Sequence, residues 1–293
     1  MKVTSFGEVL WDDFESGKVL GGAPLNVMVR LSNLGADAAM ISRRGQDADG
    51  DELVRQVAAK NVKTDFIQTD TEQATSLVKV SLDAKGCASY EIVYPCAWDR
   101  IAVENAALQR VAESDAFVFG SLAVRDEVSL ASLRRYLEVA KFKIFDVNLR
   151  EPFYTTELLL DLMKQANMLK LNDDELQLVA EALGSKYHSV EQNIRFIAEL
   201  TDTSTICVTL GNHGAVLFQD NRFVHHSGFR VQVADTVGAG DSFLGALIYK
   251  LLNRADPKEA ITFACALGGM VASKHGATPQ ISLEEIERFM YPM

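Results

Sequence analysis

Short apolar runs alternate with amphipathic, helix-patterned segments along most of the 293-residue chain, and this rhythm most constrains its fold. The amphipathic segments include 127–140 and 173–184. The apolar runs cover residues 3–10, 116–121, 143–147, 167–171 and 204–210. Strands that alternate with helices build parallel sheets whose two faces are covered by those helices. The sequence therefore predicts an α/β fold with a mostly parallel central sheet.

Residues 75–94 break this rhythm, because apolar and polar side chains alternate there with a period of two. The first half places Val78, Val80 and Leu82 on one face, and the second half repeats the alternation after a turn at 83–86. Period-two alternation around a turn is typical of a β-hairpin. We expect a hairpin with one apolar face inserted into the α/β chain.

We interpret this hairpin as a lid on a single domain of residues 1–293, formed by 75–98 with the segment near 11–20. A two-stranded ribbon is marginally stable alone in water, and an exposed apolar face needs a partner. That partner is either the site beneath the lid or the same face of a second subunit. In the second case we expect a homodimer joined through residues 75–94.

Charge and composition narrow the classes of partner. The formal net charge is −11 and the isoelectric point is near 5, which argues against nucleic acids and anionic membranes as partners. No apolar run approaches the roughly 20 residues of a membrane span, and the first residues lack a signal-peptide pattern. The four cysteines show no metal-binding spacing. These features predict a globular cytoplasmic protein that binds small molecules.

Polar residues and glycines follow several of the expected strands. Ligands in open α/β sheets bind beyond the carboxyl ends of the strands. The residues in this position are Asp12, Asn148, Arg150, Asn172, Glu175, Gly211 and Gly214. Each one alone is also typical of a turn or helix cap, and Asn172 alone favours an N-cap. The number of strands that end this way favours a ligand site.

The stretch ADTVGAGDSFLGAL, residues 234–247, places small residues and a carboxylate at the start of an expected helix. The backbone N–H groups of Gly238, Ala239, Gly240 and Asp241 can together bind an anion. The stretch lacks the third glycine of a dinucleotide fingerprint, and the chain holds no Walker A motif. A carboxylate beside such a cradle suits phosphoryl transfer to an alcohol, since it can accept the proton of the attacking hydroxyl. A plain glycine-rich turn is the alternative interpretation.

The segment DTVGAGD resembles the second signature, DTxGAGD, of the PfkB (ribokinase-like) carbohydrate kinases. Further segments are similar to the sugar-binding, first-signature, NxxE and nucleotide motifs of that family, in the same order along the chain. They are LGGAPLN (20–26), RGQDADGDEL (44–53), NDDE (172–175) and TLGNHG (209–214). The resemblance covers nearly the whole chain and implies the ribokinase-like three-layer fold with a small β lid.

Three further segments are more similar to bacterial fructokinases than to ribokinases or adenosine kinases. They are GEVLWD (7–12), EIVYPCAWD (91–99) and FDVNLR (145–150). This resemblance implies ATP-dependent phosphorylation of D-fructose to D-fructose 6-phosphate, with Mg²⁺ as cofactor. Arg44 departs from the family pattern, which has an apolar residue before G-x-D.

The resemblance assigns a role to each matching residue. Asp241 would be the base, and Gly238, Ala239 and Gly240 would supply N–H groups to the moving phosphoryl group. The sugar would be held by Asp12, Gly22, Asn26, Asn148 and Arg150, the last of which could instead clamp phosphate. The nucleotide would be bordered by Thr209, Gly211, Gly214 and Asn172.

The same resemblance implies two cation sites. Glu175 would act with Asn172 on Mg²⁺ and the phosphates, through water, because Mg²⁺ keeps much of its hydration shell. Asp235 is similar to the family's ligand for a monovalent cation such as K⁺, and a cap at the helix start is the alternative reading.

Two other functions remain open from the sequence. The chain could phosphorylate another sugar, such as 2-keto-3-deoxygluconate or ribose, or it could be a non-catalytic sugar or nucleotide sensor on the same fold. Asp241 and its glycine cradle argue against the sensor, because a protein that only binds needs no base.

Overall fold

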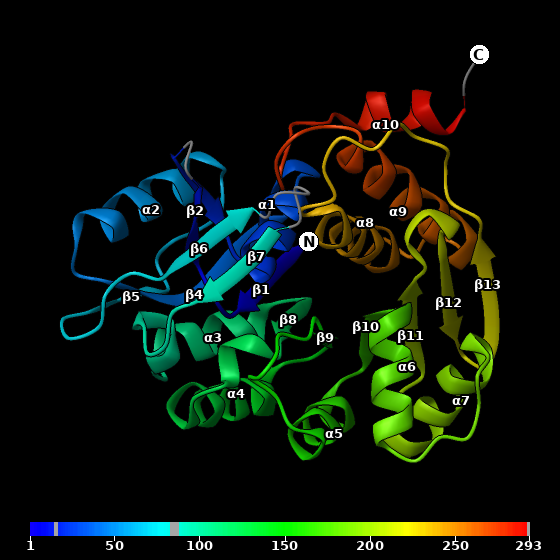
Figure 1. Cartoon of the computed structure of the whole chain (residues 1–293), viewed down its shortest axis with the longest axis horizontal. Helices are drawn as coiled ribbons and strands as arrows, with labels where there is room; N and C mark the ends of the chain where they lie inside the picture. Colours follow the sequence, from blue (N-terminus) through cyan, green and yellow to red (C-terminus); the bar gives the residue numbers. More distant parts are fainter. Residues whose placement is uncertain (15–16, 83–87, 292–293) are drawn as a thin grey trace.

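The computed structural model describes residues 1–14, 17–82 and 88–291, and a nine-stranded sheet runs through its centre (Figure 1). The strands of this central sheet are β1 (Lys2–Phe6), β4 (Asp37–Gly45), β5 (Ile67–Asp70), β8 (Ala116–Gly120), β9 (Lys143–Asp146), β10 (Met168–Asn172), β11 (Thr205–Thr209), β12 (Ala215–Gln219) and β13 (Arg222–His226). Their order is β13–β12–β11–β10–β9–β8–β1–β4–β5. Neighbours are parallel from β11 to β5, and β12 and β13 join antiparallel at one edge. The expected mostly parallel sheet is confirmed.

Helices cover both faces of this sheet and make the three layers (Figure 1). One side carries α1 (Ala23–Asn33), α2 (Ala48–Ala59), α8 (Ala239–Leu252), α9 (Pro257–Ala272) and α10 (Leu283–Met290). The other side carries α3 (Asn105–Glu113), α4 (Glu127–Val139), α5 (Thr156–Gln165), α6 (Asp173–Ala182) and α7 (Val190–Thr201). Short 3₁₀ turns lie at η1 (Ala97–Arg100), η2 (Leu122–Val124) and η3 (Gly211–His213).

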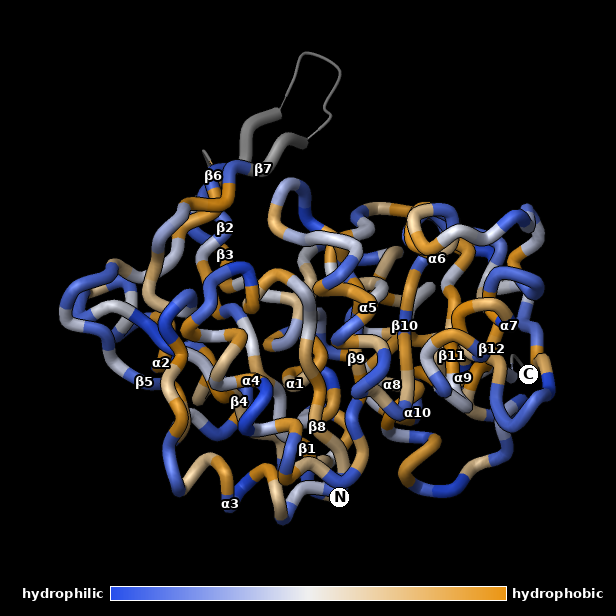
Figure 2. The backbone as a smooth tube through the Cα atoms, turned by 90° about the horizontal axis from the view of Figure 1, so that it is seen from below, coloured by the Kyte–Doolittle hydropathy of each residue, from blue (hydrophilic) through white to orange (hydrophobic). Residues whose placement is uncertain are grey.

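Two apolar cores form because successive residues of a strand point to opposite faces of the sheet. Along β8, Val118 packs into the core beneath α1 and α8, while Phe117 and Phe119 pack into the core on the side of α3 and α4. Figure 2 shows hydrophobic colour along the central strands and polar colour on the peripheral loops. Both faces of the strands are thus buried, which explains their nearly continuous apolar runs.

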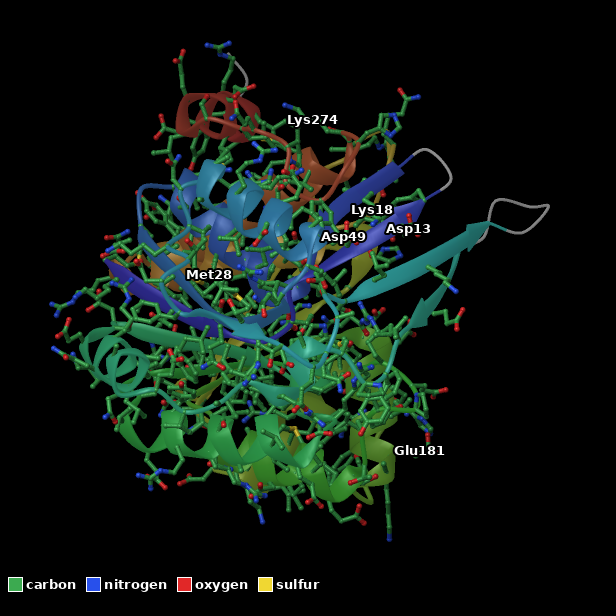
Figure 3. The ribbon with its side chains drawn as sticks, turned by 90° about the vertical axis from the view of Figure 1, so that its left-hand side faces the viewer. Asp13, Lys18, Met28, Asp49, Glu181 and Lys274 are labelled. Carbon is green, nitrogen blue, oxygen red and sulfur yellow. The ribbon has the colours of Figure 1, made fainter. Side chains whose placement is uncertain are left out.

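A separate four-stranded sheet lies beside the main body, with its hairpin extending outward (Figure 3). Its strands are β2 (Leu10–Phe14), β3 (Gly17–Gly21), β6 (Leu77–Leu82) and β7 (Ala88–Ile92), in the order β3–β2–β6–β7. Val78 pairs with Ile92 and Val80 with Tyr90, so the hairpin expected from period-two alternation is present. The expected turn at 83–86 lies outside the described residues.

The expectation of one strand over residues 3–10 is wrong. β1 ends at Phe6, and β2 begins at Leu10 in the small sheet. The backbone N–H of Gly7 donates to the carbonyl of Ile41 in the central sheet, whereas that of Trp11 donates to the carbonyl of Ser76. The chain changes sheets between these two bonds, and Asp12 therefore lies within β2 rather than in a loop after β1.

The first-signature segment anchors the small sheet to α2. Asp47 caps α2 by accepting from the Gly50 N–H, and its carboxylate also accepts from the backbone N–H and the hydroxyl of Thr75. Arg44, which departs from the family pattern, pairs with Asp51 at 2.9 Å. These contacts fix the segment that leads into β6.

Further contacts tie the other half of the small sheet to the same helix. Lys18 of β3 pairs with Asp49 of α2 at 2.7 Å (Figure 3), and the indole N–H of Trp11 donates to the carbonyl of Asp49. The small sheet is thus held at α2 from both β2 and β3.

Helix α1 packs against α8, although more than two hundred residues separate them. Arg30 is fully buried between them, and its Nε donates to Ser242 Oγ at 3.2 Å. Its Nη2 donates to the carbonyl of Pro279 at 3.1 Å. This contact brings the first and last thirds of the chain together beside the sheet.

The topology places a crevice at the carboxyl end of β1. β1 lies between β4 and β8, so the chain turns to one side of β1 first and then to the other. Crevices at such switch points are the usual ligand sites of open α/β sheets. Within the described residues, none of the helices has the length and apolar character that a membrane crossing requires.

Candidate active site

The candidate base lies at the start of α8, where a tight turn leads into the helix. Gly238 is the residue before the first helical turn and has φ 73°, a left-handed conformation that favours glycine. A Cβ at this position would overlap the carbonyl oxygen of Ala277. Asp241 lies in the first turn of α8, and its Oδ2 accepts a hydrogen bond from Asn26 Nδ2 at 2.8 Å. Two expected site residues, 215 positions apart, are therefore in direct contact.

Three influences set the proton affinity of Asp241. Burial raises the pKa of this carboxyl, while the hydrogen bond from Asn26 and the positive charges of Lys170 and Arg150 lower it. The net pKa lies above the usual aspartate range. A raised pKa suits a carboxylate that must accept a proton during the reaction, since proton transfer is most efficient near the working pH.

Two further buried carboxyl groups lie beside Asp241, and the sequence analysis did not select either one. Glu8 is 3 % exposed and Asp146 is 5 % exposed. Both line a cavity of about 10 Å³ at the β1–β8 switch point, together with Asn148. Among the described residues, no hydrogen bond reaches Glu8 Oε2 or Asp146 Oδ2, and Asp146 Oδ1 has only the Lys170 ammonium 3.2 Å away. This volume holds about one water molecule, which those oxygens would bind.

Burial dominates the titration of both carboxyl groups. It raises the pKa of Glu8 to about 7, with Arg150 opposing the shift and Asp241 adding to it. Burial also raises the pKa of Asp146, and the nearby Lys170 ammonium opposes that shift. A charged residue inside an apolar strand was the available signal for both Asp146 and Lys170.

Lys170 brings a buried positive charge into this acidic centre. Its Nζ lies 3.2 Å from Asp146 Oδ1, and both side chains are 7 % exposed. Burial lowers the pKa of Lys170, but the charges of Asp146, Glu175 and Asp241 outweigh it and leave the pKa raised. Lys170 is therefore held in its charged form.

Arg150 and Asn148 lie in the loop after β9, as expected from FDVNLR. Asn148 has φ 37° and lines the small cavity. Arg150 is exposed, and its positive charge lowers the pKa of Asp12 as well as those of Glu8 and Asp241. Its charge therefore acts on the acidic centre, while its Nη1 donates to the carbonyl of Leu149 at 2.8 Å.

Asp12 and Gly22 approach the site from the small sheet and the start of α1. Burial raises the pKa of Asp12 to about 6, and Arg150 opposes that shift. Gly22 precedes α1 with φ 116°, and a Cβ there would overlap the carbonyl oxygen of Glu8. Glycine at this position thus lets the start of α1 approach the β1–β2 segment closely.

Asn172 and Glu175 form a reciprocal cap at the start of α6. Asn172 Oδ1 accepts from the Glu175 N–H, and Glu175 Oε2 accepts from the Asn172 N–H, each at 2.8 Å. Glu175 Oε1 accepts from the Leu149 N–H at 2.9 Å, which links α6 to the loop that carries Arg150. The N-cap interpretation of Asn172 is therefore correct as structure. Both carboxylate oxygens already accept hydrogen bonds, so contact with Mg²⁺ through water fits this geometry better than direct ligation.

The expected nucleotide segment follows β11, next to the end of β10. Thr209 pairs in register with Asn172, which places the two motifs side by side. Gly211 has φ 55° and open space around it, whereas Gly214 has φ 87° and a Cβ there would overlap the carbonyl oxygen of His226. Gly214 is thus required by the turn into β12.

Asp235 fastens the loop that precedes the 238–241 turn. Its Oδ1 accepts from the Val237 N–H and its Oδ2 from the Gly276 N–H, each at 3.0 Å. It is a loop anchor rather than the N-cap of α8, a position held by Gly238. Across the residues that the structure describes, no cluster of three or more His, Cys, Asp or Glu side chains is suited to a metal ion.

The chain matches the pfkB family of carbohydrate kinases over residues 2–284. It belongs to that family. A fructokinase from Solanum tuberosum is 28 % identical over 306 residues, which cover 96 % of this chain and 93 % of that one. The resemblance of the motifs to the family is therefore confirmed, and so is the ribokinase-like fold.

Two solved structures show how the kinase fold extends over different substrates. A Vibrio cholerae fructokinase with fructose, ADP and calcium ion bound is 25 % identical, with 99 % of each chain covered and a TM-score of 0.84. An aminoimidazole riboside kinase from Salmonella enterica, complexed with aminoimidazole riboside and an ATP analogue, is 26 % identical. It covers 99 % of this chain and 100 % of its own, with a TM-score of 0.82. Kinases for different substrates are thus about equally similar to this carbohydrate kinase.

Proposed function

We propose that this carbohydrate kinase transfers the γ-phosphoryl group of ATP to D-fructose and yields D-fructose 6-phosphate and ADP. The observation that carries the proposal is the contact between Asn26 and Asp241 at the N–H cradle of α8. This contact holds the Asp241 carboxylate at the start of α8, which supports the proposed role of Asp241 as the base. The fructokinase resemblance of segments 7–12, 91–99 and 145–150 selects the sugar.

In the proposed reaction, separate residues accept the proton, bind the phosphoryl group and bind the sugar. Asp241 accepts the proton of the sugar 6-hydroxyl as that oxygen attacks phosphorus, and the bond from phosphorus to the ADP oxygen breaks. The N–H groups of Gly238, Gly240 and Asp241 bind the oxygens of the moving phosphoryl group, where charge must be neutralised. The Ala239 N–H donates to the carbonyl of Thr236 at 3.2 Å and would have to exchange that partner to join them. Asp12, Gly22, Asn26 and Asn148 bind the other sugar hydroxyls, and Arg150 clamps a phosphate or sugar oxygen.

The cofactors are part of the proposal. Mg²⁺ bound to ATP neutralises phosphate charge. Asn172 and Glu175 would orient it through water, while Thr209, Gly211 and Gly214 border the nucleotide. A monovalent cation such as K⁺ would bind near Asp235, where both carboxylate oxygens already shape the loop. Because the reaction consumes ATP, we place the protein in the cytoplasm.

Fructose should give the highest kcat/KM among fructose, ribose, adenosine, glucose and 2-keto-3-deoxygluconate, each with Mg-ATP. Buried polar groups discriminate strongly against a substrate that lacks the matching hydroxyl, so we expect a margin of at least about tenfold. A coupled assay of ADP release measures it, and Asp241→Asn protein purified in parallel controls for contaminating kinases. A preference for another sugar would replace fructose and leave the kinase assignment standing. Sugar binding without any turnover would favour the sensor alternative.

We also propose that the small sheet acts as a lid and as a dimer interface. Its register places Val19, Asp12, Val78 and Ile92 in one row across the four strands, so they share a face. Asp12 is an expected sugar ligand, which supports a position of this face over the substrate. Val19 is 45 % exposed, whereas Ile92 packs against the main body. The exposed part of the row is available to a second subunit.

Replacing Val19 with aspartate in both subunits should convert the dimer to a monomer. Two charges on the shared face would have to be buried in an isologous contact, which is strongly unfavourable. Light scattering measures the mass. Val139→Asp, at the exposed end of α4, is the matched control and should leave the dimer intact. A monomeric wild type, or a dimeric Val19→Asp variant, would show that this face is not the interface.

A further inference from the structure

Lys170 and Asp146 form a buried ion pair beside the candidate base. The two residues are register partners on neighbouring parallel strands, β10 and β9, so their side chains lie on the same face of the sheet. Their charged atoms are 3.2 Å apart. Burying two charges is costly, and a buried pair is weak evidence for stability alone. The pair therefore calls for a role other than holding the sheet together.

The surroundings of Gly240 show that the Lys170 ammonium lies next to the start of α8. An ideal Cβ on this residue would meet one atom within 4 Å, the Nζ of Lys170 at 3.5 Å. Unlike Gly238, Gly240 does not have a positive φ, so the backbone does not require glycine there. Glycine inside a helix costs about 0.5–1 kcal/mol relative to alanine. The space that Gly240 leaves open faces the ammonium, so the 238–241 turn and Lys170 are adjacent.

We propose that Lys170 is a charge-positioning residue of the phosphoryl-transfer site, held in place by Asp146. Its ammonium supplies a fixed positive charge next to the 238–241 turn, where both the base and the incoming phosphoryl group are negative. The inference deepens the proposed kinase function and rests on it. Fixed positive charge at such a position stabilises a negatively charged transition state without reorganisation during the reaction.

The electrostatics agree with this placement. Asn26 of α1 donates a hydrogen bond to Asp241. The charged groups that influence Asp241 electrostatically are Lys170 of β10, Asp146 of β9, Arg150 in the loop after β9 and Glu8 before β2. Lys170 and Arg150 lower the pKa of Asp241, in opposition to burial. Arg150 is exposed and screened by solvent, whereas Lys170 is buried and keeps its effect.

Lys170→Met removes the charge and keeps a long apolar side chain. We expect kcat to fall by about 10- to 100-fold. The pKa of Asp241 should rise by about 1 unit, because an opposing positive charge is lost. The base must be deprotonated to act, so the acid limb of the kcat/KM profile moves to higher pH. Lys170→Arg keeps the charge and should hold the limb near its wild-type position.

Asp146→Asn separates an electrostatic role from a loss of packing. Removal of this negative charge by itself favours the ionised form of Asp241, so the acid limb stays in place or moves to lower pH as long as the Lys170 ammonium remains beside the 238–241 turn. We expect a severalfold fall in kcat, because Lys170 loses its anchor. If the substitutions acted only by disturbing the packing of the site, the acid limb of the kcat/KM profile would move in the same direction in Lys170→Met and in Asp146→Asn.

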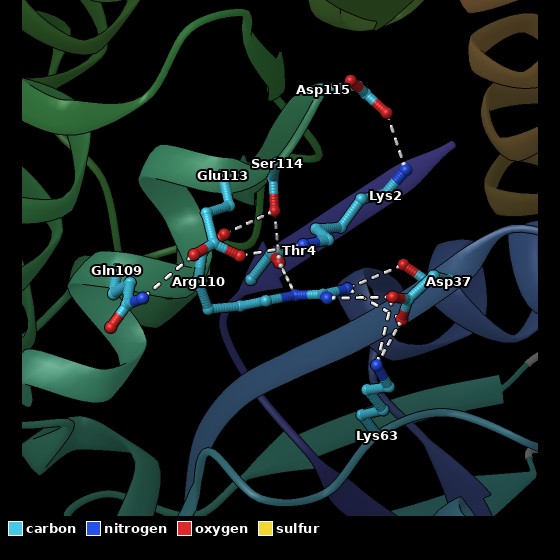
Figure 4. A network of polar contacts seen from close by, with 9 residues as sticks. All are labelled: Lys2, Thr4, Asp37, Lys63, Gln109, Arg110, Glu113, Ser114 and Asp115. Carbon is cyan, nitrogen blue, oxygen red and sulfur yellow. Dashed lines mark hydrogen bonds and ion pairs between the residues drawn. The ribbon is translucent and has the colours of Figure 1, made fainter.

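Arg110 offers a matched control at the opposite ends of the strands from the candidate site. It is also 7 % exposed, and it pairs with Asp37 at 3.0 Å while its Nε donates to Thr4 Oγ1 (Figure 4). Asp37 is the first residue of β4 and so lies at the amino ends of the parallel strands, whereas the candidate active site lies at their carboxyl ends. Arg110→Met should lower the melting temperature and leave kcat and the acid limb unchanged.

A measurement without turnover keeps this inference distinct from the proposed function. The pKa of Asp241 is followed by ¹³C NMR of labelled aspartate carboxyl groups, with Asp241→Asn protein to assign the resonance. If wild type phosphorylates none of the sugars, the proposed function fails, while the NMR titration still tests the charge of Lys170. An unchanged Asp241 pKa in Lys170→Met, with a loss of melting temperature alone, would overturn the inference and leave the pair purely structural.

Discussion

Asp241→Asn should lower kcat by roughly 10²-fold or more and leave sugar affinity nearly unchanged. The substitution keeps the shape of the side chain and removes its ability to accept a proton. The asparagine oxygen can still accept the hydrogen bond that Asn26 Nδ2 now donates at 2.8 Å, so the start of α8 should keep its position. Steady-state kinetics give kcat, and calorimetric titration with sugar gives the affinity.

Asp161→Asn is the matched control for this experiment. Asp161 lies on α5 with its side chain 44 % exposed, and it pairs at 3.0 Å with Arg134 of α4 rather than with a residue of the proposed site. Its replacement removes one carboxylate of the same kind and should leave kcat at the wild-type value. Near-normal turnover in Asp241→Asn would remove Asp241 from the mechanism and require another base.

Gly238→Ala should lower kcat by about 10²-fold and the melting temperature by roughly 5 °C. Gly238 has φ 73°, and a Cβ there would overlap the carbonyl oxygen of Ala277. Either the 238–241 turn or the neighbouring loop must move, and a displacement of about 1 Å at a cradle of N–H groups is enough for a large loss. Kinetics and differential scanning calorimetry measure the two effects.

Gly184→Ala is the control that tests backbone strain without displacement of the 238–241 turn. Gly184 has φ 92° after α6, with open space around the position of a Cβ. The substitution carries a similar backbone cost of about 1–3 kcal/mol without the overlap. It should lower the melting temperature and leave kcat intact. If both variants lose activity equally, or Gly238→Ala keeps it, the geometry of the turn is not what supports turnover.

The fold was largely predictable because the strands of each sheet leave a recognisable pattern of apolar residues in the sequence. Apolar runs with helices between them predicted the parallel sheet, and alternation around Val78 predicted the hairpin. The boundary near Gly7 was not predictable, since apolar residues such as Phe6 and Val9 occur on both sides of it. Which sheet each of them joins depends on hydrogen bonds to Ile41 and Ser76, which are distant in sequence.

The candidate site was predictable only where residues belong to a continuous motif. The spacing of DTVGAGD identified Asp241 and its turn, and NDDE identified Asn172 and Glu175. Lys170 and Asp146 were missed although each interrupts an apolar run. No role can be assigned to a single charged residue in a strand until its cross-strand partner is known. That partnership is set by the register of β9 and β10, and no local pattern encodes it.

The contact of α1 with α8 has a consequence for how the chain is made. Asn26 meets its partner Asp241 across 215 residues, and Arg30 meets Ser242 across 212. At about 5–20 residues per second, a ribosome needs roughly 10 to 40 s to cover that interval. During this time the apolar face of α1 has no α8 to cover it and is exposed on the nascent polypeptide. We therefore expect the first third of the chain to rely on chaperones or on provisional contacts until synthesis has passed α8, and a prematurely terminated product ending before Asp241 to aggregate rather than retain partial activity.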